Sequence, residues 1–271
     1  MGTLLTVALG TWVAGNAYAA VRVANSGRNA REDRTPAAVG LAFRSVTYGR
    51  ALPAWYVPGD SARPVIVIVH GYGGNRTNNL EVGPPLHRRG YGLLFIDLGY
   101  ALGRHHYGGG QREANEVAAA VGWVKTHAGV PAVLLGYSAG GFAVLAAVAR
   151  GTKVAAVIAD SGFPGYRSEV AFRGHTLEAS TGLFPLLYPL VSGGGHALDV
   201  GYEVKDRPYR TPTLIIQGAA DRVVSWRNGR RLARLTHGQL WLLPGVGHTT
   251  AFRRYPVTYI ERLVAFLGSA H

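Results

Sequence analysis

Short apolar runs recur along the chain, separated by polar or amphipathic segments. The runs are rich in β-branched residues and lack polar alternation, which is typical of strands buried on both faces of a parallel sheet. Upstream of them, residues 41–49 and 51–59 form two extended segments joined around Gly49 and Arg50, which predicts an antiparallel hairpin. The predicted buried strands span residues 64–70, 91–97, 131–136, 154–160, 211–218 and 239–245.

Helical periodicity lies between these strands. Apolar residues recur at i, i+3, i+4 and i+7, which defines one face of a helix. The alternation of strands and helices predicts an α/β fold in which a mostly parallel, doubly wound sheet has helices on both sides. The clearest periodic positions are Val117, Ala120, Val121 and Val124, and later Ile260, Leu263, Val264 and Leu267.

One long insertion interrupts this alternation. Residues 161–210 contain no clear strand and include the apolar stretch TGLFPLLYPLVSGGG. A segment of this length inside a compact domain is usually a lid or a binding element. We therefore expect a single domain over residues 41–271 with a lid insertion at about 161–210.

The N-terminal segment has a different character, because its first 21 residues carry no charge. About 20 such residues can cross a bilayer. Two interpretations remain open for residues 1–24. They form a membrane anchor with a single span, and the side of the membrane on which the domain would lie stays open. Alternatively they form a signal peptide cleaved after Ala19, which would leave a secreted protein. Residues 25–40 are polar and predict a linker.

The formal net charge of +13 raises the question of a nucleic-acid or anionic partner. The arginines are scattered, and no basic run is interleaved with aromatic residues, so we expect no nucleic-acid partner. The absence of cysteine excludes disulfides and thiolate chemistry. Residues 104–107 include two histidines but no neighbouring acid in the sequence, so we expect no metal site there.

A serine lies at the junction of a predicted strand and a predicted helix, in the sequence Gly136-Tyr137-Ser138-Ala139-Gly140. A nucleophile raised on such a tight turn needs neighbours that are almost free of side chains, so that strand and helix can approach closely. The N–H groups at the start of the helix favour developing negative charge. Ser138 is therefore the predicted nucleophile.

A serine hydroxyl becomes nucleophilic when a base accepts its proton. His248 follows the last predicted strand, at the sheet edge where Ser138 is expected, and is the candidate base. Asp221 follows the preceding strand and is the candidate acid that orients the imidazole. The chain order of serine, acid and histidine is typical of one hydrolase architecture. Asp160 is the rival acid, and Asp97 is expected to brace a loop.

An acyl-transfer site also needs N–H donors for the oxyanion. The sequence HGYGGN, from His70 to Asn75, follows the first parallel strand and can turn the N–H of Tyr72 toward the serine. The N–H of Ala139 is the expected second donor. We interpret His70 as a structural residue that fixes this loop through hydrogen bonds.

The motifs HGYGGN, GYSAG, GAADRVV and GVGH, in this order, resemble those of the α/β-hydrolase superfamily. More narrowly, the chain is similar to ABHD-like, membrane-associated serine hydrolases from about Leu41 onward. The resemblance implies the roles given above for Ser138, Asp221 and His248. It also implies that neither a metal nor an organic cofactor takes part.

The resemblance implies hydrolysis of a carboxylic ester or thioester through an acyl-enzyme on Ser138. The apolar insertion favours a small-molecule or lipid-like acyl substrate. Two alternatives stay open: a peptidase or amidase of the prolyl-oligopeptidase-like branch, and a non-catalytic, membrane-bound binding protein. The sequence does not determine the oligomeric state.

Overall fold

The computed structural model describes residues 2–165, 190, 200 and 209–270. In these residues the strands form one sheet in the order β1-β2-β4-β3-β5-β6-β7-β8. The pairs from β4 to β8 are parallel, whereas β2 is antiparallel to both of its neighbours. The strands are β1 (Arg44–Tyr48), β2 (Leu52–Val57), β3 (Val65–Val69), β4 (Gly92–Ile96), β5 (Ala132–Tyr137), β6 (Ala156–Asp160), β7 (Thr213–Gly218) and β8 (Gln239–Leu243).

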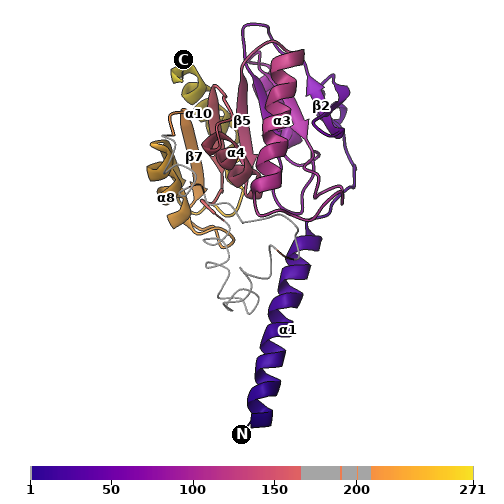
Figure 1. The fold of residues 1–271 in the computed structure, drawn as a ribbon. Helices are drawn as coiled ribbons and strands as arrows, with labels where there is room; N and C mark the ends of the chain where they lie inside the picture. The colour runs from indigo at the N-terminus through magenta and orange to yellow at the C-terminus, as the bar shows by residue number, and fades with distance from the viewer. Residues whose placement is uncertain (1, 166–189, 191–199, 201–208, 271) are drawn as a thin grey trace.

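The predicted mostly parallel sheet and N-terminal hairpin are therefore confirmed. Helices lie on both sides of the sheet, as Figure 1 shows. The described helices are α1 (Gly2–Ser26), the 3₁₀ turns η1 (Pro36–Val39) and η2 (Leu80–Val82), α2 (Gly83–His87), α3 (Gln111–His127), α4 (Ala139–Ala149), α8 (Trp226–Thr236), α9 (Ala251–Arg254) and α10 (Pro256–Ser269).

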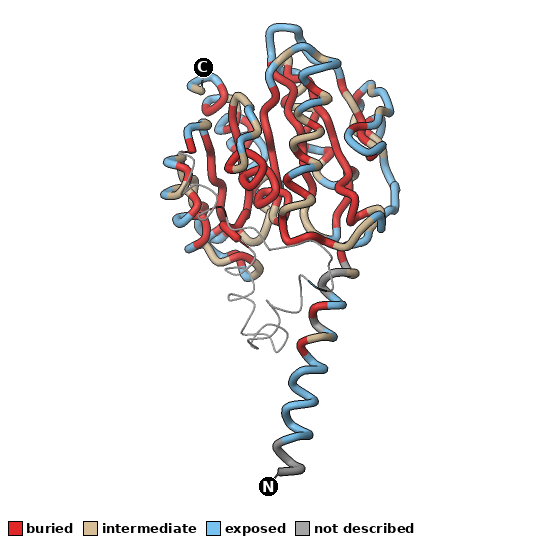
Figure 2. Tube along the Cα trace, in the orientation of Figure 1, coloured by how far each residue is buried: buried red, intermediate tan, exposed pale blue. Residues whose placement is uncertain are grey.

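Alternate residues of each central strand enter two separate cores. On β3, Val67 packs into the core formed with α3 and α4, whereas Ile66 packs into the core formed with α2 and α10. The strand tubes are buried along most of their length in Figure 2. Burial on both faces explains why these strands read as continuous apolar runs in the sequence.

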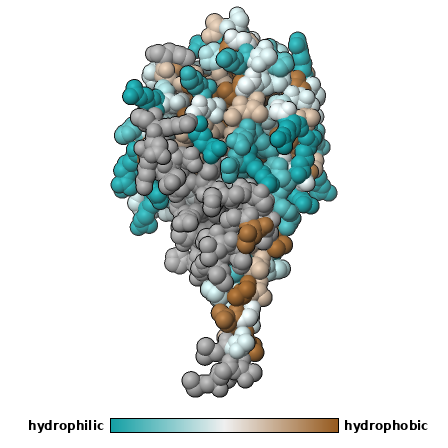
Figure 3. Space-filling model, viewed as in Figure 1, coloured by the Kyte–Doolittle hydropathy of each residue, from teal (hydrophilic) through white to brown (hydrophobic). Residues whose placement is uncertain are grey.

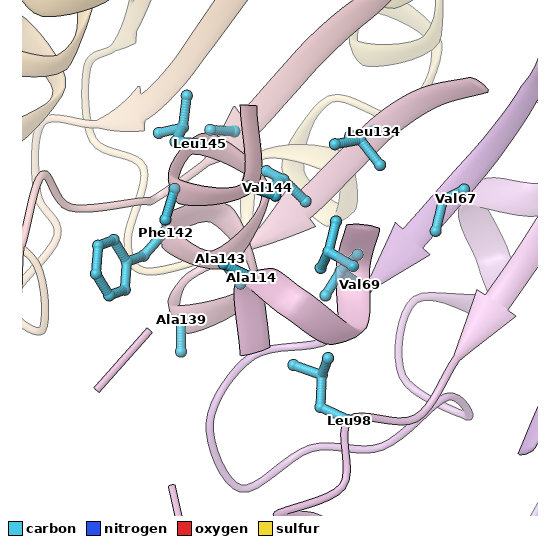
Figure 4. Packing of buried hydrophobic residues seen from close by; sticks show 14 of the residues in the cluster. Val67, Val69, Leu98, Ala114, Leu134, Ala139, Phe142, Ala143, Val144 and Leu145 are labelled. Carbon is cyan, nitrogen blue, oxygen red and sulfur yellow. The ribbon is translucent and has the colours of Figure 1, made fainter. Parts of the chain in front are cut away.

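Helix α4 is buried along its whole length. It packs between the sheet and α3, and Figure 4 shows Phe142 and Val144 among the other apolar side chains of this core. Because no face of α4 meets water, its sequence has no polar stripe. Ala139, which begins this helix and directly follows Ser138, is consequently held in place by the packing of α4.

Helix α1 extends away from the sheet in Figure 1, and Val7, Leu9 and Tyr18 are each more than half exposed. Figure 3 shows hydrophobic residues along this helix, below a largely hydrophilic domain surface. Among the described residues, no helix combines the length and hydropathy that a bilayer span requires. The predicted single span over residues 1–24 is thus not supported, because polar positions such as Thr11 and Asn16 interrupt the apolar run. Cleavage after Ala19 stays a prediction.

The segment predicted as a linker contacts the domain. Asn29 donates from its backbone N–H to Ala101 and from its amide to the Gly73 carbonyl. Glu32 forms an ion pair with the buried Arg76. These residues thus lie along the loop that follows β3. Most of the predicted lid, residues 161–210, lies outside the described residues.

Candidate active site

Ser138 occupies a strained turn between β5 and α4. Its φ is +53° and its ψ is −117°, a conformation that L-residues rarely adopt. The Ser138 N–H donates to the Asp160 carbonyl at 2.8 Å, which anchors the turn to β6. Strain of this kind persists where surrounding contacts determine the backbone fully, and it occurs often at functional sites.

The glycines around Ser138 are required by close backbone contacts. A Cβ on Gly136 would lie 2.3 Å from the Gly140 carbonyl oxygen, and a Cβ on Gly140 would lie 2.4 Å from the Val69 carbonyl oxygen. No side chain fits at either distance. The spacing of glycine, serine and glycine thus follows from the packing of β3, β5 and α4 against one another.

His248 lies in the loop after β8, and its Nε2 is 2.9 Å from the Ser138 Oγ. Its Nδ1 is 2.8 Å from Oδ2 of Asp221. A carboxylate can only accept, so Nδ1 carries the proton and the Nε2 lone pair faces the serine hydroxyl. The structure brings together the three residues predicted as nucleophile, base and acid.

The loop that carries His248 closely approaches the end of β7. A Cβ on Gly218 would lie 2.2 Å from the Val246 carbonyl oxygen. The two loops are further joined by the backbone bond from Ala220 N–H to the Val246 carbonyl, at 3.0 Å. Glycine at position 218 therefore allows the acid and the base to meet.

The Asp221 carboxylate is buried and held by donors from its own segment. Oδ1 accepts from the N–H groups of Val223 and Val224 at 2.8 and 2.9 Å. Oδ2 accepts from the Gln217 amide at 3.1 Å in addition to the imidazole. Sequence reasoning missed Gln217, whose only signal was a polar side chain inside the apolar run of β7.

Asp160, the rival acid, has other partners. Its Oδ1 accepts from the Ser161 hydroxyl at 2.8 Å and its Oδ2 from the Tyr259 hydroxyl at 3.0 Å. Burial raises the pKa of Asp160 to about 6, against the opposing effect of these hydrogen bonds. Asp221, rather than Asp160, contacts the imidazole of His248.

The loop that follows β3 lies against the serine turn. A Cβ on Gly71 would be 3.3 Å from the Ser138 Cβ, so the backbone beside Tyr72 borders the hydroxyl. The Tyr72 ring packs on Tyr100 and Tyr107, at ring distances of 6.0 and 5.3 Å. Tyr72 and Ala139, the predicted oxyanion donors, are thus on the two segments that flank Ser138.

His70 has the structural role predicted for it. Its Nε2 accepts from the Leu98 N–H at 3.1 Å, and its Nδ1 donates to the Gly71 carbonyl at 2.8 Å. Burial lowers the pKa of His70 to about 4, so the ring stays neutral and both bonds persist. Asp97 likewise braces the loop, as predicted, through a bidentate contact with Arg76.

The two histidines at positions 105 and 106 do not gather metal ligands. His105 pairs with Glu116 at 2.7 Å, an acid from α3 that the sequence pattern did not place nearby. In the part of the chain that the structure describes, no group of three histidine or acidic side chains could hold a metal ion.

Comparison with known proteins gives one matching family, described as the alpha/beta hydrolase fold, over residues 64–187. The uncharacterized protein YfhR of Escherichia coli K12 is 27% identical over 241 residues, which span 82% of this chain and 78% of YfhR.

Two solved structures give the same architecture. The esterase Pf2001 of Pyrococcus furiosus superposes with a TM-score of 0.70 at 17% identity, covering 90% of this chain and 96% of its own. A membrane phospholipase A, described as a bacterial virulence factor, has a TM-score of 0.60 at 20% identity, over 99% of this chain and 96% of its own.

Proposed function

We propose that this chain, which has the α/β-hydrolase fold, is a serine hydrolase that cleaves carboxylic esters through an acyl-enzyme on Ser138. The observation that carries the proposal is the chain of contacts from the Ser138 hydroxyl through the His248 imidazole to Asp221, at 2.9 and 2.8 Å. The same chemistry extends to thioesters.

The steps follow from these contacts. His248 Nε2 accepts the hydroxyl proton as Ser138 Oγ attacks the acyl carbon, and Asp221 stabilises the imidazolium that forms. The N–H groups of Tyr72 and Ala139 are the proposed donors to the oxyanion. The imidazolium then gives its proton to the departing alcohol. Water, deprotonated by the same nitrogen, releases the acid and restores the serine.

An apolar acyl group is the proposed substrate class. The insertion that follows β6 contains the apolar stretch TGLFPLLYPLVSGGG, a composition that favours a substrate with an apolar acyl group. The likeness to an esterase and to a membrane phospholipase A agrees with this substrate class.

The first test is the nucleophile. Ser138→Ala should abolish labelling by a fluorophosphonate probe and reduce p-nitrophenyl ester hydrolysis by about 10⁴-fold or more, because the variant lacks the hydroxyl on which the proposed acyl-enzyme forms. Ser45→Ala, an exposed serine on β1, is the matched control and should retain both. Labelling that survives in Ser138→Ala would remove Ser138 from this role. A wild-type protein inert toward both reagents would favour the non-catalytic binding alternative.

The second test is a series of p-nitrophenyl esters from acetate to palmitate. Each methylene that the enzyme buries contributes about 0.8 kcal/mol, so kcat/KM should rise roughly fourfold per carbon until the binding region is filled. A preference for acetate would contradict the apolar substrate. Prolyl p-nitroanilides belong in the same assay, since faster turnover of these would favour the peptidase alternative.

A further inference from the structure

A second carboxylate lies close to the proposed base, and the reaction described above does not use it. Asp160, the last residue of β6, is 1% exposed. Its described partners are two neutral hydroxyls, Ser161 at 2.8 Å and Tyr259 at 3.0 Å. A buried acid whose described hydrogen-bond partners are all neutral costs stability. A costly buried charge beside the proposed site suggests that the residue has a role there.

The hydrogen bonds of Asp160 lead toward His248. The Ser161 hydroxyl donates its single proton to Asp160, and its oxygen accepts the N–H of Thr249 at 3.0 Å. Thr249 directly follows His248 in the chain. The carboxylate therefore fixes the direction of the Ser161 hydroxyl, and this hydroxyl in turn holds the backbone beside the imidazole.

Ser161 and Thr249, which this hydrogen bond joins, both have strained backbone conformations that the surrounding contacts must stabilise. Ser161 has a φ of +56° and Thr249 a φ of +50°, in the left-handed region that favours glycine. The Ser161 N–H donates to the Ile216 carbonyl at 2.8 Å, which ties the turn to β7. Ser138 shares this left-handed φ, so strained turns from three different strands meet at the site.

We propose that Asp160 is a positioning residue for His248: through Ser161 it fixes the loop that carries the imidazole, and it adds a buried charge beside the proposed site. This inference rests on the proposed function for its kinetic consequences, but not for its structural ones. Asp221 contacts the ring itself, whereas Asp160 acts through the backbone and through its charge.

The surroundings of Asp160 determine how its charge responds to pH. Tyr259 of α10 and Tyr137 of β5 face it as neutral hydroxyls, and Tyr259 also lies 3.4 Å from the Tyr137 oxygen. The charge of His248 lowers the pKa of Asp160 and the charge of Asp221 raises it, while burial raises it to about 6. Asp160 therefore changes its charge near pH 6.

Two variants test this role. Asp160→Asn keeps the shape and an acceptor for Ser161 but removes the charge, so the ring resonances of His248 should shift. Tyr259→Phe removes a donor to the carboxylate, so Asp160 takes up its proton at higher pH than in the wild type. NMR of the imidazole, assigned with His248→Asn, measures the first effect without any need for activity.

Ester hydrolysis gives the second readout. Protonation of Asp160 removes its charge from the site, so kcat/KM should fall as the pH falls through this protonation. Asp160→Asn should remove this component of the acidic limb and lower kcat about tenfold, as expected for hydrogen bonds to a charged group. In Tyr259→Phe the limb should move to higher pH.

Glu113→Gln is the matched control, because Glu113 is also a buried carboxylate but caps α3 through the N–H groups of Gly108 and Gly110. It should keep the wild-type ring resonances of His248 and the wild-type acidic limb. Unchanged His248 resonances in Asp160→Asn would overturn the inference, as would an unmoved acidic limb in Tyr259→Phe. Failure of the proposed function has a different signature, namely absent fluorophosphonate labelling of the wild-type protein.

Discussion

The Asp221 carboxylate is oriented by its own segment, whether or not a substrate is present. Its donors Val223, Val224 and Gln217 come from β7 and the turn that follows it, and the imidazole completes the set. Each donor removes an alternative orientation of the carboxylate. Orientation of this kind, fixed during folding, costs nothing at the moment of reaction.

Asp221→Asn should therefore lower kcat by about 10⁴-fold with little change in KM, because an amide can donate to Nδ1 and select the wrong imidazole tautomer. Steady-state kinetics on a p-nitrophenyl ester measure this effect. The exposed Asp33 gives the control variant Asp33→Asn, which should behave as the wild type. A loss of less than tenfold in Asp221→Asn would mean that another group orients His248.

His70 makes stability depend on pH. Its pKa falls from an ordinary value of 6.5 to about 4 in the fold, because burial disfavours the imidazolium. The unfolded chain therefore binds a proton that the folded chain does not, between pH 6.5 and about 4. Above pH 6.5 both states are neutral at this position, so the penalty is absent there and develops as the pH falls.

Between pH 7 and pH 4 the wild type should consequently lose about 3 kcal/mol of unfolding free energy that His70→Gln does not lose. Urea unfolding at the two pH values measures the difference. His127→Gln, which changes an exposed histidine at the end of α3, should follow the wild-type curve. Identical pH dependence in wild type and His70→Gln would place the acid sensitivity elsewhere.

At the scale of elements, the packing of β3, β5 and α4 leaves no room between their backbones. Gly140→Ala would place a methyl group 2.4 Å from the Val69 carbonyl oxygen. It should destabilise the fold by about 3 kcal/mol, as overpacking does. It should also displace Ser138 from His248, so that activity falls further than stability alone explains.

Gly122→Ala in α3 is the matched control, because nothing lies within 4 Å of the added methyl. Alanine is the better helix former, so this variant should gain roughly 0.5–1 kcal/mol. Chemical denaturation of both variants measures the change in the free energy of unfolding. The difference between them shows whether glycine is needed at position 140 for steric reasons or only for its conformational freedom. A neutral Gly140→Ala would contradict the packing argument.

The sequence was most informative about the strands, because burial on both faces leaves an unbroken apolar run at each of them. The turns at Ser138, Asp221 and His248 were also predictable, since they follow such runs at one edge of a parallel sheet. The contacts of residues 27–34 with the loop after β3 could not be predicted. Polar residues that bond to a distant loop have the same composition as a solvated linker, as Asn29 and Glu32 illustrate.

Polar residues that support the proposed catalytic residues were equally hard to predict from the sequence. Gln217 and Ser161 matter because of partners that come from other strands, and single-sequence periodicity carries no information about those partners. Helix α1 was read from its lack of charge as a membrane anchor or a signal peptide. The span is not supported, because the threonine, asparagine and glycine within the helix lower its hydropathy below what a span requires.

For the whole molecule, the order of the sheet separates the site residues in the chain and joins them in space. Ser138, Asp221 and His248 follow β5, β7 and β8. Any fragment that holds all three must therefore extend from residue 138 to residue 248. During synthesis the serine leaves the ribosome more than a hundred residues before its base. A growing polypeptide thus holds the Ser138 hydroxyl without its proposed base until β8 and the loop after it have emerged, so the proposed chemistry cannot begin before then.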